Sequence, residues 1–169
     1  MDICRENKND MLNEYQRLFL ERAIELSRLG MNSGQGGPFG CVIVRNNEII
    51  GEGHNMVTST NDPTAHAEVV AIREACKKLN TYQLEGCEIY TSCEPCPMCL
   101  GAIYWARPSA VYYANTRKDA AAIHFDDDFI YEEIQAKIQE RKIPFIHLPH
   151  VKAREVFEEW QQLVKKKTY

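Results

Sequence analysis

No stretch of this 169-residue sequence approaches the roughly 18 uninterrupted apolar residues of a membrane-spanning helix. An excess of basic residues is also missing, since 20 Lys and Arg stand against 24 Asp and Glu, for a net charge of −4. Proteins that bind nucleic acids through the phosphates carry an excess of basic residues, which this chain lacks. Residues 1–10 are polar and lack the apolar core of a signal peptide. We therefore expect a cytoplasmic chain whose partners are neither membranes nor nucleic acids.

Internal repeats, linkers and low-complexity tracts are absent as well. The 44% apolar and 26% charged residues are ordinary for a globular protein. At roughly 100–200 residues per domain, the length predicts one domain over residues 1–169. The seven cysteines are an odd number, and three of them fall within seven residues. They indicate reduced thiols rather than a disulfide framework.

The order of the predicted elements favours an α/β fold. A helix over 11–29 is expected to stop at Gly30, and a hairpin turning at Asn46 and Asn47 follows it. Beyond the hairpin, strands alternate with helices, which is typical of a sheet layered with helices. The strands are predicted at 39–44, 48–53, 88–91, 110–114 and 145–148, and the later helices at 64–79, 97–107, 128–140 and 151–167.

Two short motifs carry the chemistry. Residues 95–99 read Pro-Cys-Pro-Met-Cys, and residues 66–68 read His-Ala-Glu. Cys96 and Cys99 can both reach one ion from the first turn of a helix, whose N-terminus favours thiolates. Softness and geometry then favour Zn²⁺. His66 can supply a nitrogen ligand and leave the fourth position to water, as in catalytic rather than structural zinc sites.

Glu68 follows His66 closely enough to lie beside the metal and take a proton from a water that the metal activates. His-x-Glu followed by Pro-Cys-x-x-Cys is the signature of nucleobase deaminases, in which the glutamate is the general acid/base and not a ligand. Alternatives remain for the cysteines. They are a redox pair, the start of an iron–sulfur motif, or, with Cys93, a closed Cys₃His structural zinc site.

The sequence resembles the cytidine deaminase-like superfamily of zinc deaminases. The resemblance covers the glycine-rich segment before Phe39, residues 53–55, residues 62–68 and residues 91–99. Within that superfamily the chain is especially similar to the bacterial guanine deaminases. Four segments carry this similarity together: 90–94 (Tyr-Thr-Ser-Cys-Glu), 102–108 (Ala-Ile-Tyr-Trp-Ala-Arg-Pro), 125–131 (Phe-Asp-Asp-Asp-Phe-Ile-Tyr) and 166–169 (Lys-Lys-Thr-Tyr).

This resemblance implies a three-layer α/β/α fold with a central five-stranded mixed sheet. It implies hydrolysis of guanine to xanthine and ammonia in purine catabolism or salvage. It assigns one Zn²⁺ per chain to His66, Cys96 and Cys99, and the transfer of protons to Glu68. Asp127 is implied as a second catalytic carboxylate near the amino group that leaves.

The resemblance also implies the substrate contacts and the assembly. Tyr169 and the C-terminal helix and tail, at about 151–169, are implied to close the active site of a homodimer whose partners exchange C-terminal segments. From the sequence it stays open whether the tail acts in its own chain or in the partner. His124, His147 and His150 have no ligand spacing and are expected to be structural. The implied substrate-binding residues are Asn55 as an orienting amide, Phe39 and Trp105 as aromatic walls, Ala67 and Tyr169.

Three other functions remain open at this point. A tRNA adenosine deaminase would need a basic surface around its pocket, whereas this chain has an acidic block at 126–128 and its one run of three lysines at 165–167. A cytosine or other free-base deaminase would share the metal site and differ only in pocket residues. A zinc-stabilised interaction module would bind the metal and have no turnover.

Overall fold

The computed structural model of the chain describes residues 13–125 and 127–169. The predicted polar start at 1–10 and Asp126 of the acidic block lie outside the described residues. The chain divides into two compact units, Met1–Asp127 and Asp128–Tyr169, and each is described by itself. The single domain expected over residues 1–169 stays a prediction. Among the helices that the structure describes, none is long and apolar enough to cross a membrane.

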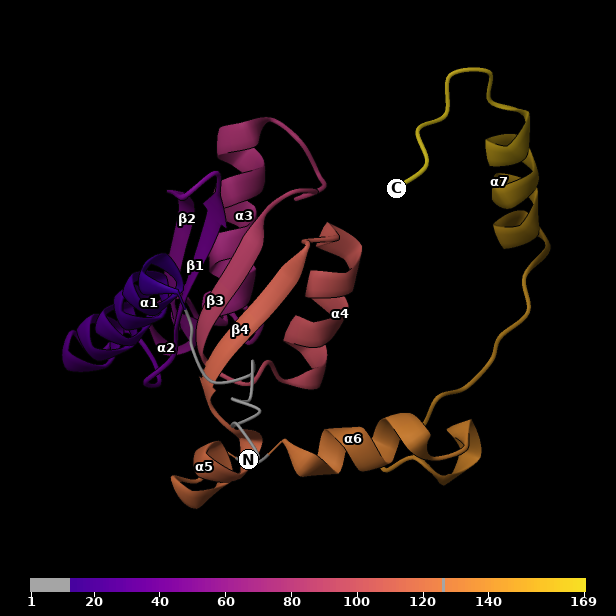
Figure 1. Cartoon of the computed structure of the whole chain (residues 1–169). Coiled ribbons are helices and arrows are strands. Elements are labelled where there is room, and N and C mark those ends of the chain that lie inside the picture. The colour runs from indigo at the N-terminus through magenta and orange to yellow at the C-terminus, as the bar shows by residue number, and fades with distance from the viewer. Residues whose placement is uncertain (1–12, 126) are drawn as a thin grey trace, which may run out of the picture. The chain divides into compact units, whose positions relative to one another are not determined.

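The first unit is built on one mixed sheet of four strands, in the order β2-β1-β3-β4 (Figure 1). β1 pairs antiparallel with both β2 and β3, and β3 pairs parallel with β4. Asn46 and Asn47 have φ values of 53° and 62°, as the predicted two-residue hairpin turn requires. The α/β class and the mixed sheet are therefore confirmed. The strands are β1 (Gly40–Arg45), β2 (Glu48–His54), β3 (Glu88–Cys93) and β4 (Ala110–Asn115).

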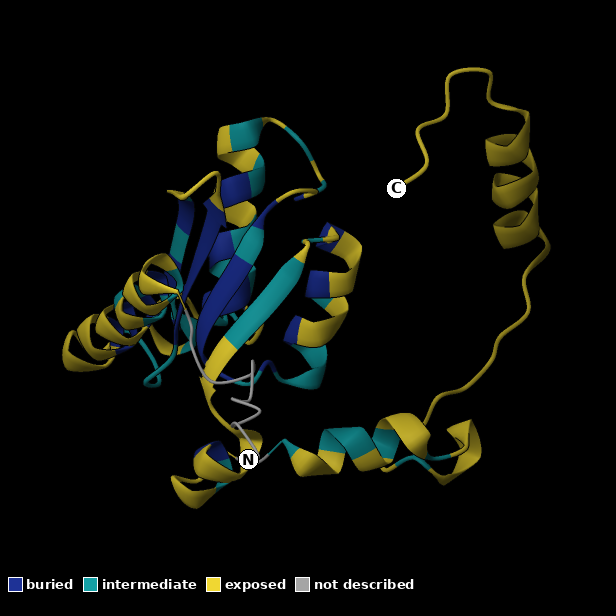
Figure 2. Cartoon of the chain, viewed as in Figure 1, coloured by how far each residue is buried: buried dark blue, intermediate teal, exposed yellow. Residues whose placement is uncertain are grey.

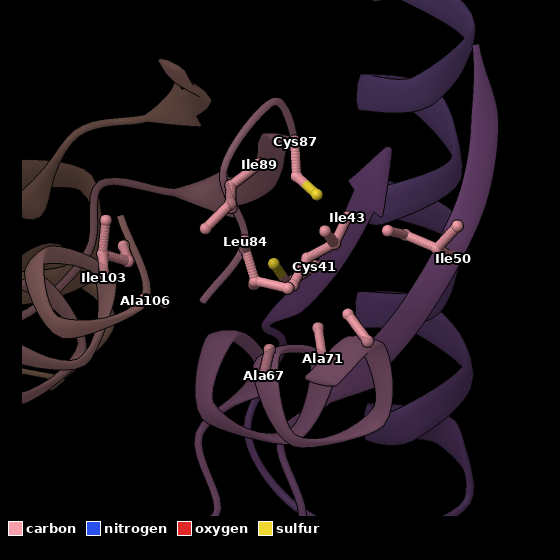
Figure 3. Close-up of a cluster of buried hydrophobic side chains, with 11 residues drawn as sticks. Cys41, Ile43, Ile50, Ala67, Ala71, Leu84, Cys87, Ile89, Ile103 and Ala106 are labelled. Atoms are coloured by element: carbon pink, nitrogen blue, oxygen red, sulfur yellow. The ribbon is translucent and has the colours of Figure 1, made fainter. Parts of the chain in front are cut away.

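Helices cover both faces of this sheet, because alternate strand residues point to opposite faces. Phe19 and Leu26 of α1 pack with Val42, Val44 and Tyr90 on one face. A second cluster joins the other face to α3 and α4, and it includes Ile43 and Ile89 (Figure 3). The buried residues concentrate on β1, β3 and these helix faces (Figure 2). The helices are α1 (Glu14–Asn32), α2 (Val57–Thr60), α3 (Ala67–Leu79), α4 (Pro97–Ala106) and α5 (Arg117–Ala122).

A glycine in β2 lets α3 lie unusually close to the sheet. A Cβ atom on Gly53 would come within 2.3 Å of the Ala67 carbonyl oxygen and 2.7 Å of the Ala71 backbone nitrogen. The helix meets the sheet through small side chains, since Ala67, Ala71 and Ala75 are all fully buried. This contact fixes the N-terminal end of α3, which carries His66 and Glu68.

The predicted fifth strand at 145–148 is wrong for the described chain, and the sheet has four strands rather than five. Pro144 and Pro149 bound this segment and remove backbone donors at both ends. Phe145, Ile146 and Leu148 are 59%, 78% and 81% exposed, and apolar residues on both sides of a strand need cover on both faces. The second unit, which contains α6 (Asp128–Gln135), η1 (Ile138–Glu140) and α7 (Val151–Gln162), does not supply it.

Several predicted boundaries also shift. Helix α1 does not stop at Gly30 but continues to Asn32. Gly30 packs against His54, where a Cβ atom would come within 2.7 Å of the ring. The predicted helix at 151–167 ends at Gln162, because Leu163 adopts an extended conformation.

Candidate active site

The N-terminal ends of two helices meet at the candidate site. His66 is the N-cap of α3, and Glu68 lies in its first turn. Cys96 is the N-cap of α4 and Cys99 lies in its first turn, with Pro97 at the first helical position, where proline is favoured. Backbone N–H groups and the helix dipole favour negative charge at both ends. The two motifs are thus placed so that their side chains converge on one point.

The donor atoms of His66, Cys96 and Cys99 lie within 4.8 Å of one another. His66 Nδ1 is 3.5 Å from Cys96 Sγ and 3.6 Å from Cys99 Sγ. Zinc bonds of about 2.3 Å to sulfur and about 2.1 Å to nitrogen at a tetrahedral angle would separate N and S by about 3.6 Å. The three residues therefore fit a zinc ion bound through Nδ1, with one position open.

Cys93 is not a member of this group of possible ligands. Its buried thiol donates instead to the carbonyl oxygen of Thr116, with Sγ 3.6 Å from that oxygen. Burial raises the pKa of Cys93 to about 11, so that it stays a thiol. A closed Cys₃His site would need this sulfur to turn away from Thr116.

The cysteine pair is poised to carry negative charge. The pKa of Cys96 is lowered to about 4, first by the hydrogen bond from Cys99 and then by that from His66. The pKa of Cys99 is raised, first by its hydrogen bond to Cys96 and then by burial of the thiol. The pKa of His66 is raised by its hydrogen bond to Cys96. The hydrogen bond between the two cysteines thus favours a thiolate at Cys96, and both sulfurs must be deprotonated to bind a metal.

Glu68 lies beside the metal ligands and is 6% exposed. Its Oε1 accepts a hydrogen bond from Thr91 Oγ1 at 3.1 Å, and its Oε2 accepts one from Cys99 Sγ at 3.3 Å. Burial raises the pKa of this carboxyl group. A carboxyl group in such a place can hold a proton and release it during a reaction, as a general acid/base must.

A cavity of about 410 Å³ opens next to these groups, within the first unit. Two aromatic rings form one part of its wall, since Phe39 and Phe125 meet edge to face with ring centroids 4.9 Å apart. Gly37 makes room for the Phe125 ring, which a Cβ atom there would approach to 2.7 Å. Such a volume suits a small planar ligand. The lining residues are Gly37, Phe39, Asn55, Val57, Thr58, His66, Glu68, Cys93, Glu94, Cys96, Arg117, Ala120, His124, Phe125 and Asp127.

Asn55 presents a defined donor to this cavity. Its side chain is buried, and Oδ1 accepts hydrogen bonds from the backbone N–H groups of Gly37 at 3.3 Å and Val57 at 3.2 Å. Because both partners are donors, the atom between them must be the amide oxygen. The NH₂ group is then the end of Asn55 that can bind an acceptor atom of a ligand.

The structure brings four of the predicted non-ligand residues to the cavity, namely Phe39, Asn55, Glu68 and Asp127. Ala67 and Trp105 are not among its lining residues. Ala67 is buried in the core, and Trp105 is 63% exposed because Cys99, Ile103 and Ala106 form the buried face of α4. Tyr169 belongs to the second unit and is 71% exposed. The substrate contacts of these three residues stay predictions.

Sequence reasoning missed part of the wall. Phe125 belongs to the segment 125–131 that resembles the guanine deaminases, and His124 has no ligand spacing, yet both residues line the cavity. Residues 117–125 reach it through α5 and the turn that follows, in which His124 has a φ of 71°. A single residue without a spacing pattern gives no signal for such a role. The resemblance of residues 125–131 to the guanine deaminases is the one sequence signal that points to Phe125.

Comparison with known proteins decides the family. Residues 13–115 match the model of the cytidine and deoxycytidylate deaminase zinc-binding region. This chain belongs to that family. The zinc cofactor predicted for this deaminase is therefore confirmed, and His66, Cys96 and Cys99 form a possible metal site consistent with one ion per chain.

The relatives of this chain include a guanine deaminase and a tRNA-specific adenosine deaminase. The chain is 58% identical to the guanine deaminase of Bacillus subtilis over 151 residues, which are 89% of this chain and 97% of that protein. The X-ray structure of that enzyme superposes with a TM-score of 0.89 at 56% identity, covering 94% of this chain and 99% of the other. The tRNA-specific adenosine deaminase of Aquifex aeolicus is 44% identical over 100 residues, 59% of this chain and 66% of that protein.

Proposed function

We propose that this chain hydrolyses guanine to xanthine and ammonia. The observation that carries the proposal is the 58% identity to the Bacillus subtilis guanine deaminase over 97% of that protein. The similarity to a tRNA-specific adenosine deaminase is lower and stops at 59% of this chain. The guanine deaminase thus accounts for more of this chain, and at higher identity, than that tRNA-specific adenosine deaminase does.

The reaction replaces the C2–N bond of guanine by a C2–O bond, with water as the source of oxygen. A Zn²⁺ ion held by His66, Cys96 and Cys99 would supply Lewis-acid chemistry and make a hydroxide available near neutral pH. Glu68 takes the proton of the attacking water and passes it to ring N3. The second proton of the same water goes to the amino group, the C2–N bond breaks, and the group leaves as ammonia. The buried position of Glu68 beside the ligand atoms supports this role.

The cavity wall supplies the groups that hold a purine. Phe39 and Phe125 offer apolar surface to the flat rings. The NH₂ group of Asn55 donates to an acceptor of guanine, which has O6, N3 and N7. Asp127 accepts from N1–H or from the exocyclic amine, and so orients the amine that leaves. This pattern of donors and acceptors differs from what adenine or cytosine requires.

We also propose a homodimer in which the C-terminal segments are exchanged and Tyr169 closes the pocket of the partner. Val156, Phe157 and Trp160 of α7 are 58%, 76% and 44% exposed in the single chain, and apolar patches of this kind mark interaction surfaces. The open edge of the sheet at β4 exposes Tyr113 as well. We place the enzyme in the cytoplasm, since the six described cysteines are free thiols.

A panel of substrates tests the function. Zinc-loaded protein is incubated with each free base, with guanosine, adenosine and cytidine, and with a tRNA anticodon stem-loop, and ammonia release is measured. We expect release from guanine and little from the others. Release from the stem-loop and not from guanine would overturn the proposal in favour of tRNA deamination, and an inert zinc protein would favour an interaction module.

A further inference from the structure

Thr91 makes a direct contact with the proposed proton carrier. Its hydroxyl Oγ1 lies 3.1 Å from Glu68 Oε1, and both residues are buried, with exposed fractions of 1% for Thr91 and 6% for Glu68. The two residues come from different elements, the strand β3 and the helix α3. The contact therefore joins the first turn of α3 to the middle of the sheet.

The hydroxyl is held by a rigid neighbourhood. Thr91 pairs with Cys41 in the antiparallel ladder between β1 and β3 and with Tyr113 in the parallel ladder between β3 and β4. Its Oγ1 also lies 3.4 Å from the carbonyl oxygen of Gly40. A threonine side chain has one stiff rotatable bond. The position of Oγ1 is thus set by the sheet and not by the loop residues of the pocket.

Thr91 differs from the other hydrogen-bond partners of Glu68. Cys99 Sγ also donates to Glu68 Oε2, but it belongs to one of the three possible metal ligands. Glu68 also receives a hydrogen bond from its own backbone N–H, but that bond cannot tie the carboxylate to another element. Among the described donors to this carboxylate, Thr91 is therefore the one that lies outside α3 and is not a possible metal ligand.

We propose that Thr91 is a positioning residue, whose hydroxyl holds the Glu68 carboxylate in the orientation that proton transfer requires. This inference rests on the proposed function, because it gives Glu68 the task of moving protons. A hydroxyl can both donate and accept. Its Oγ1 lies 3.1 Å from Glu68 Oε1 and 3.4 Å from the Gly40 carbonyl oxygen, so that the hydroxyl is held between the carboxylate and strand β1.

Removal of the hydroxyl at constant shape tests this. Thr91→Val keeps the β-branched shape, whereas Thr91→Ser keeps the hydroxyl. Hydrogen bonds to charged groups are strong, so we expect Thr91→Val to lower kcat about 10- to 100-fold. KM should change less than about threefold, since Thr91 does not line the cavity. Thr91→Ser should restore most of kcat.

The neighbouring residue Ser92 is a matched control. Its hydroxyl is also buried in β3, but it accepts from the Gly40 backbone N–H at 3.0 Å and has no bond to Glu68. Ser92→Ala should therefore lower the midpoint of thermal unfolding and leave kcat near that of the parent. All variants should hold one zinc per chain, measured by mass spectrometry of the metal, because no ligand is changed.

Full kcat in zinc-loaded Thr91→Val would overturn the inference, and so would an equal fall of kcat in Thr91→Val and Ser92→Ala. If Thr91→Val does not fold, Thr91→Ala removes the same hydroxyl without placing a methyl group against the carboxylate. If the parent protein does not deaminate guanine, the proposed function fails, and crystal structures decide the inference. An unchanged Glu68 side chain in zinc-loaded Thr91→Val would overturn it, and a displaced one would support it.

Discussion

Side chains in the first turns of two helices define the chemistry at the scale of single residues. His66 and Glu68 begin α3, and Cys96 and Cys99 begin α4. Each motif spans only a few residues, so that local helix geometry fixes the separation of its side chains. A residue-scale change in either motif should therefore have a specific and separable effect on metal content or on turnover.

Zinc content should depend on Cys96 and not on Cys93. Cys96→Ala removes one of three donor atoms that lie within 4.8 Å of one another, so we expect the purified protein to hold little zinc. It should also unfold at a lower temperature, because metal binding stabilises the folded chain. Metal analysis and thermal unfolding measure both effects. Cys93→Ser is the control that should keep one zinc per chain, and its loss of zinc would indicate a Cys₃His site instead.

Turnover should depend on Glu68 independently of zinc. Glu68→Gln keeps the shape of the side chain and an oxygen that can still accept from Thr91, but it cannot take a proton. We expect one zinc per chain, guanine affinity near that of the parent by calorimetry, and kcat lower by about 10²–10⁴-fold. Near-native kcat in this variant would contradict the role of Glu68 as proton carrier.

The sequence was sufficient to predict that these four residues lie together, but not which other residues line the pocket. Within a short motif at a helix N-terminus, the helix geometry fixes the distances between the side chains. His66, Glu68, Cys96 and Cys99 do lie together. Phe125 and His124 reach the cavity through the path of the chain after β4, which no local spacing encodes. Residues placed by tertiary structure alone are the ones that a single sequence leaves open.

At the scale of elements, the close approach of α3 to β2 holds the metal-binding end of α3 in place. Gly53→Ala would put a Cβ atom 2.3 Å from the Ala67 carbonyl oxygen. Such overpacking costs about 1–3 kcal/mol, so we expect the free energy of unfolding in urea to fall by that amount. Zinc affinity should fall with it, because His66 adjoins Ala67.

Gly101 provides the opposite case in α4. It is exposed in the helix, and a Cβ atom there meets nothing within 4 Å. Gly101→Ala should therefore raise the free energy of unfolding by about 0.5–1 kcal/mol, through helix propensity alone. An equal fall in the free energy of unfolding for Gly53→Ala and Gly101→Ala would contradict the tight contact of Gly53 with α3.

Elements were predictable where the pattern and the boundary signals agreed. The hairpin at Asn46 and Asn47 and the start of α4 at Pro97 were predicted to within a residue or two, because turn and cap chemistry are local. The strand predicted at 145–148 is absent. Its run of apolar residues is typical of a strand, but no neighbouring strand pairs with it in the described chain. Pairing is decided by tertiary structure, or by a partner chain.

At the scale of the whole molecule, the proposed dimer assigns the C-terminal segment to the pocket of the other chain. Deletion of residues 165–169 should then lower guanine turnover strongly by removing Tyr169. Zinc content should not change, because all three ligands lie in the first unit. Ammonia release and metal analysis on the same preparation measure the two effects. Full turnover in the truncated protein would contradict a role of the tail in closing the site.

A mixture of two inactive variants distinguishes an exchanged tail from one that acts in its own chain. Glu68→Gln chains have an impaired catalytic site in the first unit and an intact tail. Chains truncated before residue 165 have an intact catalytic site and no tail. With exchanged tails, a mixed dimer contains one site that combines the intact core with the intact tail. An equal mixture that has re-equilibrated should then regain about a quarter of the parent activity, since half of the dimers are mixed and each has one complete site. If each tail serves its own chain, every site in the mixture keeps one defect, and activity stays at the level of the separate variants.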